Sequence, residues 1–259
     1  MAADGKRYWS YEQVHELVRC AVMEEPWWDE WRPTLIICIA AGGFVPTRIL
    51  RSFLKHKLGA NVPIQTIGLQ LYDVDGCDPS TSPVQRTQWL SYGTGPGQVL
   101  LQGQRILIVD EVDDSRKTLA HALAELEADV AAERAAHEGA GGAPWAAPEL
   151  GVFVLHNKQR PKLASLPEHI MRSRYWAGLE IEDCWCVYPW DALHIYDHTQ
   201  TAEAAGLQPG RHVRRQSSGC PAPPHPGGSA NGAGGGAIKA NGAANGGHAN
   251  GVHALTNGV

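Results

Sequence analysis

Four carboxylates within five residues form the part of this sequence most suited to chemistry. They are Asp110, Glu111, Asp113 and Asp114. Carboxylates this close repel one another unless cations or hydrogen-bond donors lie among them. Sugar hydroxyls and Mg²⁺ are partners of this kind. We therefore expect this acidic cluster to bind a hydroxyl-bearing ligand, a divalent cation or both.

The residues after the acidic cluster carry groups that hold phosphate. They are Ser115, Arg116, Lys117 and Thr118, which provide hydroxyls and cations. A helical pattern begins here, and the free N–H groups at the start of a helix attract anions. One loop therefore combines a sugar or metal end with a phosphate end.

Two simpler interpretations of this loop stay open. Asp113, Asp114 and Ser115 are residue types that commonly cap helices, but a cap accounts for only one of the carboxylates. An acidic pocket of the receiver type would need a second acidic pair at another strand end. The apolar run Thr34–Ala40 is followed instead by the small residues 41–43.

The loop Ala41-Gly42-Gly43 is a second candidate phosphate site. Glycine has no Cβ, so backbone N–H groups can approach a pyrophosphate closely. A tight turn between a strand and a helix is the alternative. If the loop binds pyrophosphate, either its backbone groups suffice or Arg48 or another cation supplies the positive charge that the loop lacks.

Both loops must be held in place by the elements around them. Helical patterns occur at Tyr11–Met23, Val45–Leu58 and Ser115–Ala136. Apolar or extended runs occur at Thr34–Ala40, Pro63–Leu71, Pro83–Leu90, Arg105–Val109 and Leu150–His156. This alternation predicts an α/β fold, with a mainly parallel twisted sheet flanked by helices. Ligands of such sheets bind beyond the carboxyl ends of the strands, where both loops are predicted to lie.

The decamer Val109–Thr118 resembles the motif with which type I phosphoribosyltransferases bind phosphoribosyl pyrophosphate (PRPP). From Tyr8 to Thr199 the chain is similar to the xanthine and hypoxanthine-guanine branch of that family. The supporting blocks are Gly42–Arg51, Ser82–Trp89, Phe153–Lys162 and Trp185–Trp190. The resemblance implies the type I fold with a small hood, and a homodimer. It also implies transfer of phosphoribosyl from PRPP to a 6-oxopurine base, with Mg²⁺ as cofactor and release of pyrophosphate.

The resemblance implies roles for single residues in PRPP binding. Asp110 and Glu111 would hold the ribose hydroxyls and Mg²⁺. Asp113 and the loop Asp114–Thr118 would complete the PRPP site, with the loop around the 5′-phosphate. The pyrophosphate would lie on Ala41, Gly42 and Gly43.

At the base end, the resemblance places Asp114 near purine N7, where we expect it to act as the general base. Lys158 would contact the 6-oxo group and Trp185 would stack on the base. Residue type alone would place a lysine in solvent and a tryptophan in the core. The long segment Tyr72–Gly103 would close over PRPP as a lid, and Arg86, Ser91 and Tyr92 are its candidate contacts, although they could equally be solvated.

Composition and charge argue against other classes of ligand. The formal net charge of −5 gives no overall basic field for nucleic acid. No apolar run is long enough to span a bilayer and the opening residues do not resemble a secretion signal, so we expect a cytosolic protein without membrane contact. The six cysteines show no spacing typical of zinc sites or disulfide frameworks.

The resemblance leaves the preferred base open among xanthine, hypoxanthine and guanine. An enzyme of the same fold that uses another base, such as orotate, is an alternative. A regulator that binds PRPP without catalysis is another, because fold does not imply function.

The chain divides by composition into a phosphoribosyltransferase domain, residues 1–206, and a linker and tail, residues 207–259. From Gln216 onward Pro, Gly, Ala and Asn dominate, and Lys239 is the one formally charged side chain. Such a segment buries too little apolar surface to offset its chain entropy, so a disordered tail is expected.

Deleting residues 216–259 should leave both turnover and melting temperature nearly unchanged, because the tail has too little apolar content to join the core. Steady-state assays and thermal melts of the full and shortened chains test this. A clear loss of activity on deletion would show that the tail has a function.

Overall fold

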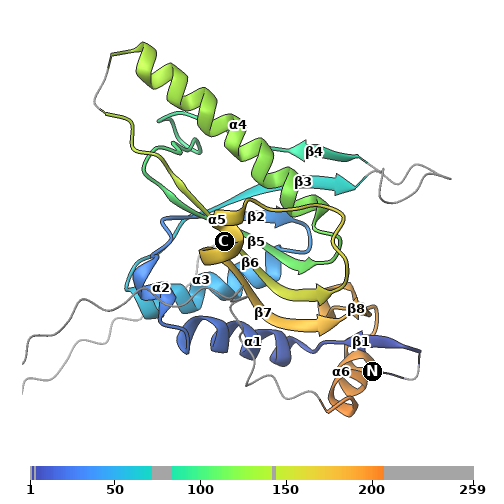
Figure 1. The fold of residues 1–259 in the computed structure, drawn as a ribbon. Helices are drawn as coiled ribbons and strands as arrows, with labels where there is room; N and C mark the ends of the chain where they lie inside the picture. The colour runs from blue at the N-terminus through green and yellow to red at the C-terminus, as the bar shows by residue number, and fades with distance from the viewer. Residues whose placement is uncertain (1, 3, 72–82, 142–143, 207–259) are drawn as a thin grey trace, which may run out of the picture. The chain divides into compact units, whose positions relative to one another are not determined.

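A six-stranded sheet forms the centre of the computed structural model (Figure 1). Its strands are β2 (Leu35–Ala40), β3 (Ile64–Leu71), β4 (Val84–Gln88), β5 (Arg105–Asp113), β6 (Glu149–Gln159) and β7 (Tyr175–Glu182). They lie in the order β4-β3-β2-β5-β6-β7. All neighbours are parallel except β3 and β4, so the predicted α/β fold with a mainly parallel sheet is confirmed.

The structure describes residues 2, 4–71, 83–141 and 144–206. The predicted tail therefore lies outside the described residues, and the boundary at residue 206 stays a prediction. None of the helices in the described part of the chain is both long and apolar enough to cross a membrane.

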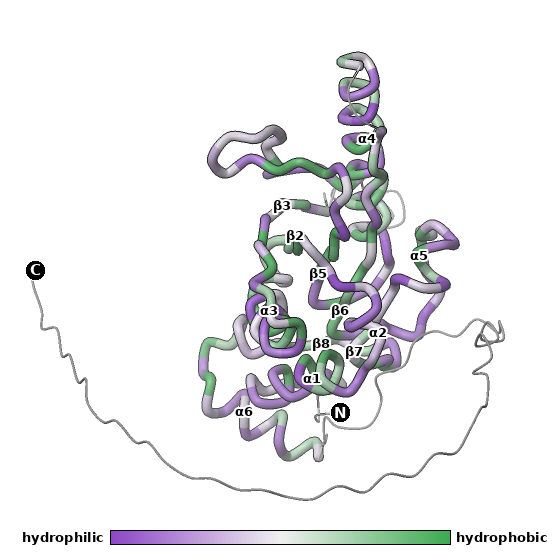
Figure 2. The backbone as a smooth tube through the Cα atoms, turned by 90° about the vertical axis from the view of Figure 1, so that its left-hand side faces the viewer, coloured by the Kyte–Doolittle hydropathy of each residue, from purple (hydrophilic) through white to green (hydrophobic). Residues whose placement is uncertain are grey.

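Helices cover both faces of the sheet. One face carries α1 (Tyr11–Met23), α2 (Trp27–Glu30) and α3 (Phe44–Leu58), and the other carries α4 (Lys117–Gly139) and α5 (Glu168–Ser173). Successive strand residues point to opposite faces, so Leu107 packs toward α1 and α3 while Ile106 and Ile108 pack toward α4. Because both faces are buried, these strands are apolar along most of their length, as Figure 2 shows.

A small hood stands apart from the main sheet. It consists of β1 (Lys6–Tyr8), β8 (Trp185–Val187), the 3₁₀ turn η1 (Pro189–Asp191) and α6 (Ile195–Ala204). Strands β1 and β8 pair in parallel, although they come from opposite ends of the folded chain. The hood implied by the resemblance is thus confirmed. Its strands are too short to leave a periodic pattern in the sequence.

Two strands run further than their apolar patterns predict. Strand β5 continues through the acidic cluster to Asp113, and β6 continues past His156 to Gln159. The two extensions pair with each other, with Asp113 opposite Asn157. Ladder hydrogen bonds therefore override the low strand propensity of these polar residues. As a result α4 begins at Lys117 and not at Ser115.

Three acidic residues of α4, spaced four apart along one face, hold the segment that leads from β4 to β5. The contacts are Arg86 Nη1 to Glu125 Oε2 at 2.9 Å, Trp89 Nε1 and Tyr92 Oη to Asp129 Oδ2 at 2.6 Å, and the Leu101 and Gln102 N–H groups to Glu133 at 2.9 Å. We call this set the α4 acid ladder. Arg86 and Tyr92, considered above as lid contacts, therefore face α4 in this structure, and residues 72–82 of the expected lid lie outside the described residues.

Replacing Asp129 with Ala should lower the free energy of unfolding by about 1–3 kcal/mol, because two partly buried donors lose their acceptor. Glu138→Ala on the same helix is the matched control. Its exposed ion pair with Arg134 should contribute about 0–1 kcal/mol. Urea unfolding of both variants measures the difference, and equal losses would show that Asp129 contributes no more than a surface charge.

Candidate active site

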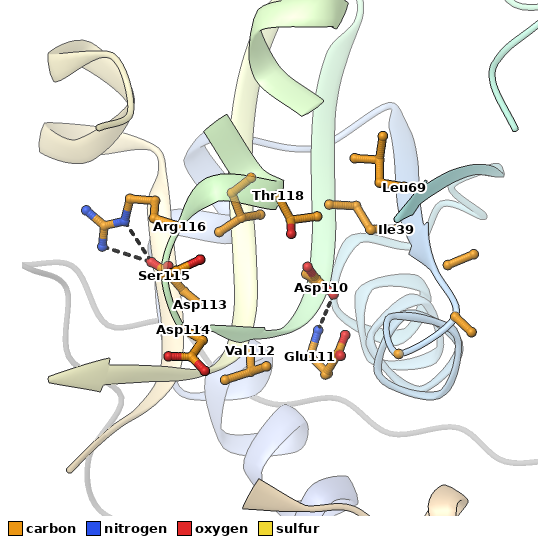
Figure 3. Close-up of a pocket in the computed structure, with 14 residues that line it drawn as sticks. Ile39, Leu69, Asp110, Glu111, Val112, Asp113, Asp114, Ser115, Arg116 and Thr118 are labelled. Atoms are coloured by element: carbon orange, nitrogen blue, oxygen red, sulfur yellow. Dashed lines mark hydrogen bonds and ion pairs between the residues drawn. The ribbon is translucent and has the colours of Figure 1, made fainter. Parts of the chain in front are cut away.

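A pocket of about 300 Å³ lies at the carboxyl ends of β2 and β5 (Figure 3). It brings together both loops singled out in the sequence. Its lining residues are Ile39, Ala40, Ala41, Gly42, Leu69, Asp110, Glu111, Val112, Asp113, Asp114, Ser115, Arg116, Thr118 and Leu119. Gly43, Lys117, Lys158 and Trp185 are the predicted site residues that do not line it.

Asp110, which is buried, and Glu111, which is partly buried, form an acidic pair that has no cationic partner among the described residues. Asp110 is 7% exposed, and its Oδ1 accepts the Glu111 backbone N–H at 2.9 Å. Burial and the neighbouring Glu111 charge raise the pKa of the Asp110 carboxyl well above its usual value. Glu111 Oε2 is also buried and accepts no hydrogen bond from the described residues. The pair therefore has acceptor capacity that only hydroxyls or a cation from a ligand would satisfy.

The same pair fits Mg²⁺ that enters together with a phosphorylated ligand. Among the described residues, no group of three or more His, Cys, Asp or Glu side chains could hold a metal ion by itself. Mg²⁺ commonly uses one or two carboxylates and completes its six positions with water and substrate phosphates. Asp110 and Glu111 supply that number of carboxylates.

The Ala41-Gly42-Gly43 loop packs against backbone at Gly43, where a side chain would not fit, and against the Glu111 carboxyl at Gly42, which a side chain there would displace. A Cβ on Gly42 would lie 2.0 Å from the carboxyl carbon of Glu111, and one on Gly43 would lie 2.5 Å from the Ile39 carbonyl oxygen. The Ala40–Ala41 peptide is cis. The glycines thus let this loop approach the end of β5, which places the loop and the acidic pair in one pocket.

The N-termini of α3 and α4 both face this region, and neither N-cap residue caps its own helix with a side chain. Their N-cap residues, Gly43 and Arg116, make no side-chain capping hydrogen bond. In α1, by contrast, Ser10 and Gln13 form a complete capping box. At the start of α4, Ser115 Oγ accepts the Lys117 N–H at 3.4 Å. The N–H groups and the positive dipole at the start of a helix are suited to an anion. The pocket therefore offers two places for phosphate, one on each side of the acidic pair.

Arg116 has an unusual position at the start of α4. Its φ of 71° lies in the left-handed region, which is costly for a residue with a Cβ. Its guanidinium points away from Asp110, Glu111 and Thr118, as Figure 3 shows, and donates to Asp113 Oδ2 at 2.9 Å. Arg116 therefore shapes the phosphate loop through its backbone, while its charge is used inside the protein.

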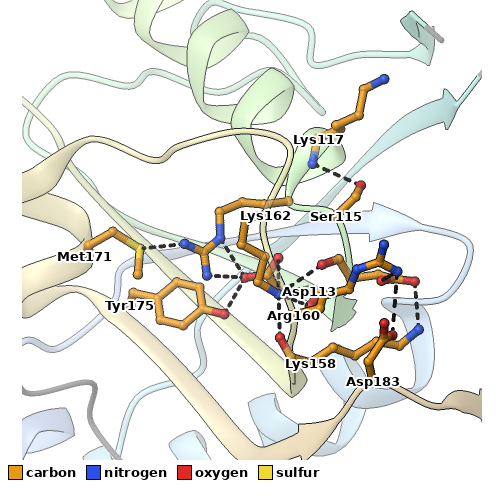
Figure 4. A network of polar contacts seen from close by, with 11 residues as sticks. Asp113, Ser115, Lys117, Lys158, Arg160, Lys162, Met171, Tyr175 and Asp183 are labelled. Carbon is orange, nitrogen blue, oxygen red and sulfur yellow. Dashed lines mark hydrogen bonds and ion pairs between the residues drawn. The ribbon is translucent and has the colours of Figure 1, made fainter. Parts of the chain in front are cut away.

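Asp113 is the buried centre of a polar network that supports the phosphate loop (Figure 4). Its side chain is 0% exposed, and Oδ2 accepts from Tyr175 Oη at 2.6 Å as well as from Arg116. Lys162 Nζ donates to the backbone carbonyls of Asp113 and Asp114 at 2.7 and 3.0 Å. Tyr175 and Lys162 were not among the predicted site residues, because they lie far along the chain from Asp113 and no local spacing connects them.

The Asp114 carboxylate forms ion pairs with two cationic side chains and does not cap a helix. Its Oδ2 lies 2.7 Å from Lys158 Nζ, and its Oδ1 lies 3.0 Å from Arg160 Nη1. The capping interpretation is therefore wrong for this residue. Lys158 lies within β6 with its side chain 7% exposed, so the interpretation of a solvated lysine is also wrong. Arg160 was not predicted as a site residue.

Trp185 and Arg48 differ in what they can offer to a ligand. The Trp185 indole is 70% exposed, whereas Trp28 and Trp176 are buried in the core. An indole with open faces is available for stacking. Arg48 lies on the exposed side of α3 and donates to Ser52, so it does not supply the charge that the Ala41-Gly42-Gly43 loop lacks.

Comparisons with known proteins agree with this geometry. No protein-family model matches the chain. The hypoxanthine-guanine phosphoribosyltransferase of Schizosaccharomyces pombe is 45% identical over 209 residues, which cover 78% of this chain and 97% of that protein. Xanthine phosphoribosyltransferase 1 of Saccharomyces cerevisiae is 42% identical over 212 residues, which cover 80% of this chain and 99% of that protein.

Solved structures show the same fold. A hypothetical protein from Neisseria gonorrhoeae with bound ppGpp is 32% identical, with a TM-score of 0.59 over 79% of this chain and 98% of that one. A purine phosphoribosyltransferase from Pyrococcus horikoshii shares the fold at 21% identity, with a TM-score of 0.50 over 73% of this chain and 97% of that one. From its identity with the curated relatives over nearly their whole length, the chain belongs to the family of hypoxanthine-guanine and xanthine phosphoribosyltransferases.

Proposed function

We propose that this protein transfers the 5-phosphoribosyl group of PRPP to a 6-oxopurine base, xanthine, hypoxanthine or guanine, and releases pyrophosphate. One observation carries the proposal. An acidic pair of buried Asp110 and partly buried Glu111, without a cationic partner among the described residues, lies in one pocket between the N-terminal ends of α3 and α4. PRPP has the complementary order of groups, with ribose hydroxyls between a 5′-phosphate and a pyrophosphate.

In this proposal the chain's own groups hold PRPP at three points. Asp110 and Glu111 accept hydrogen bonds from the ribose hydroxyls. The N–H groups and hydroxyls of the loop Ser115–Thr118 hold the 5′-phosphate, and the backbone of residues 41–43 faces the pyrophosphate. Mg²⁺ held by Asp110 and Glu111 would neutralise charge on the leaving pyrophosphate. Holding the sugar and the base nitrogen in line supplies much of the catalysis, because the displacement at C1 needs little covalent help.

At the base end, Lys158 and Asp114 form one functional pair. Lys158 donates to the purine 6-oxo group, and Asp114 accepts the proton that the imidazole ring of the purine loses as its nitrogen bonds to C1. Their ion pair holds the donor and the acceptor side by side, 2.7 Å apart, as neighbouring O6 and N7 atoms on one edge of a purine would need. Trp185 stacks on the base from the hood.

The Neisseria relative supports the class of ligand. Its structure contains ppGpp, a guanine nucleotide that bears two diphosphate groups. Guanine, ribose and diphosphate are the groups that the proposed reaction brings together. The homodimer and the cytosolic location expected above stay predictions.

A base panel tests the proposed function. The purified protein is supplied with PRPP and Mg²⁺ and, in turn, with xanthine, hypoxanthine, guanine, adenine and orotate, and pyrophosphate release is measured. We expect release with at least one of the three 6-oxopurines and none with adenine or orotate. Release with none of the three would contradict the proposal.

Replacing Asp110 with Asn should raise the melting temperature of the ligand-free protein at pH 7 and weaken PRPP binding. The folded-state pKa of Asp110 is raised, so this group stabilises the fold below its unfolded pKa of about 4. This stabilisation is lost as the pH rises through the pKa of Asp110 in the folded protein. Asn stays neutral and keeps an oxygen for the Glu111 N–H.

The effect of Asp110→Asn on stability should disappear near pH 4, where the wild-type carboxyl is protonated as well. Thermal melts between pH 4 and pH 8, with calorimetric titration of PRPP and Mg²⁺, measure both effects. A lower melting temperature at pH 7 would show that the charged carboxylate stabilises the fold. Unchanged PRPP affinity would remove Asp110 from the ribose site.

Asp114→Asn should keep the fold and most of the PRPP affinity but slow the chemical step by about 10²–10⁴-fold, because an amide cannot take the proton. The Asn oxygen can still accept from Lys158. Asp183→Asn is the matched control, since it removes an acidic partner of the same Arg160 and does not line the pocket. Single-turnover rates are the right measurement, because slow product release cannot hide the chemical step. A near-wild-type rate would mean that the proton leaves by another route.

A further inference from the structure

Tyr188 and His156 form a buried polar pair that none of the roles above uses. Tyr188 follows β8 in the hood, His156 lies in β6, and they are 4% and 0% exposed. Tyr188 Oη lies 2.8 Å from His156 Nδ1 and 3.3 Å from the carbonyl oxygen of Glu111. The pair therefore joins the hood, the sheet and the backbone of one ribose-site carboxylate.

The direction of these hydrogen bonds follows from the surroundings of the His156 ring. Burial lowers the pKa of His156 to about 3, so the ring is neutral and carries one N–H. Its Nε2 is buried and has no hydrogen-bond partner among the described residues. A hydrogen at Nε2 would be a buried donor without an acceptor, which is rarer and more costly than a bare acceptor. His156 Nδ1 therefore donates to Tyr188 Oη, and Tyr188 donates to the Glu111 carbonyl.

Packing holds both rings in these orientations. His156 stacks on Trp9 with ring centroids 4.1 Å apart. Tyr188 stacks on Trp190 with centroids 4.6 Å apart and planes inclined by 5°. Burial raises the pKa of Tyr188, so its hydroxyl stays protonated and remains a donor. The two hydrogen bonds, from His156 to Tyr188 and from Tyr188 to the Glu111 carbonyl, are thus formed before any ligand binds. We call them the relay.

Glu111 lies where the sheet no longer supports β5 on both sides. The register between β2 and β5 ends at Cys38 opposite Val109, and beyond that point β5 pairs with β6 alone. The Glu111 N–H donates to the Asp110 carboxylate, and its carbonyl accepts from Tyr188. Two hydrogen bonds therefore fix the peptide groups on either side of the Glu111 Cα, which sets the direction of the Cα–Cβ bond from which its carboxylate extends.

We propose that Tyr188 and His156 are positioning residues for PRPP, whose relay holds the Glu111 carboxylate toward the ribose hydroxyls before PRPP binds. Groups held in their bound orientation lose less conformational freedom on binding, so the ligand binds more tightly. Neither residue touches the reacting atoms. The inference rests on the proposed function, which supplies PRPP as the ligand. A direct measurement of PRPP binding tests the positioning role separately from catalysis.

Tyr188→Phe is the first test, because it removes the hydroxyl and keeps the stacked ring. The Kd for PRPP with Mg²⁺, measured by calorimetry well below the melting temperature, should rise about 3–10-fold, the effect of one net hydrogen bond. The KM for PRPP should rise in parallel while kcat stays within about twofold. Tyr196→Phe, which changes a hydroxyl that is 84% exposed on α6, should leave all three values unchanged.

His156→Asn and His156→Leu form a matched pair that separates positioning from packing. Both lose the stacking on Trp9, but an Asn amide can donate from near the Nδ1 position and Leu cannot. We expect His156→Asn to retain most of the PRPP affinity. His156→Leu should raise the Kd for PRPP as much as Tyr188→Phe does. Equal Kd values for Asn and Leu, or a wild-type Kd for Tyr188→Phe, would overturn the inference. Wild-type protein that binds PRPP without releasing pyrophosphate would contradict the proposed function alone, and failure to bind PRPP at all would overturn both.

Discussion

The unequal neutralisation of the carboxylates at the end of β5 is the constraint on which the rest of the structure depends. Asp113 is buried and receives hydrogen bonds from Arg116 and Tyr175. Asp114 is paired with two cations. Asp110 and Glu111 have no such partners in the part of the chain that the structure describes, and burial raises the pKa of Asp110. Two of the charges thus serve the fold, while the other two keep their capacity for a ligand.

This division ties the stability of the protein to its function. Burying Asp110 beside Glu111 without a cation destabilises the ligand-free fold, since desolvation and the neighbouring charge both oppose ionisation of Asp110. A ligand that brings hydroxyls and a metal ion relieves that cost and so stabilises the bound state. Under the proposed function, the same structure that makes Asp110 costly to ionise would favour PRPP over ligands without hydroxyls or metal.

The remaining parts of the protein hold this site from two sides. On one side, the α4 acid ladder holds the segment from β4 to β5 against the helix whose N-terminus follows the proposed phosphate loop. On the other side, the hood reaches the end of β5 through Tyr188 and the Glu111 carbonyl. Both attachments use hydrogen bonds with partly or fully buried groups, which are stronger and more directional than contacts in water.

The sequence by itself determined the α/β class, the two loops at strand ends and the family, because apolar periodicity and the decamer Val109–Thr118 are local patterns. It did not show which carboxylate would be neutralised. That outcome depends on Lys158, Arg160, Lys162 and Tyr175, which strands β6 and β7 and the segment between them bring to the end of β5. Strand pairing also carried β5 through Asp113 and β6 past Lys158, against the propensity of polar residues. Only the tertiary structure decided these points, since charge pairing and sheet register arise between residues that are distant in the chain.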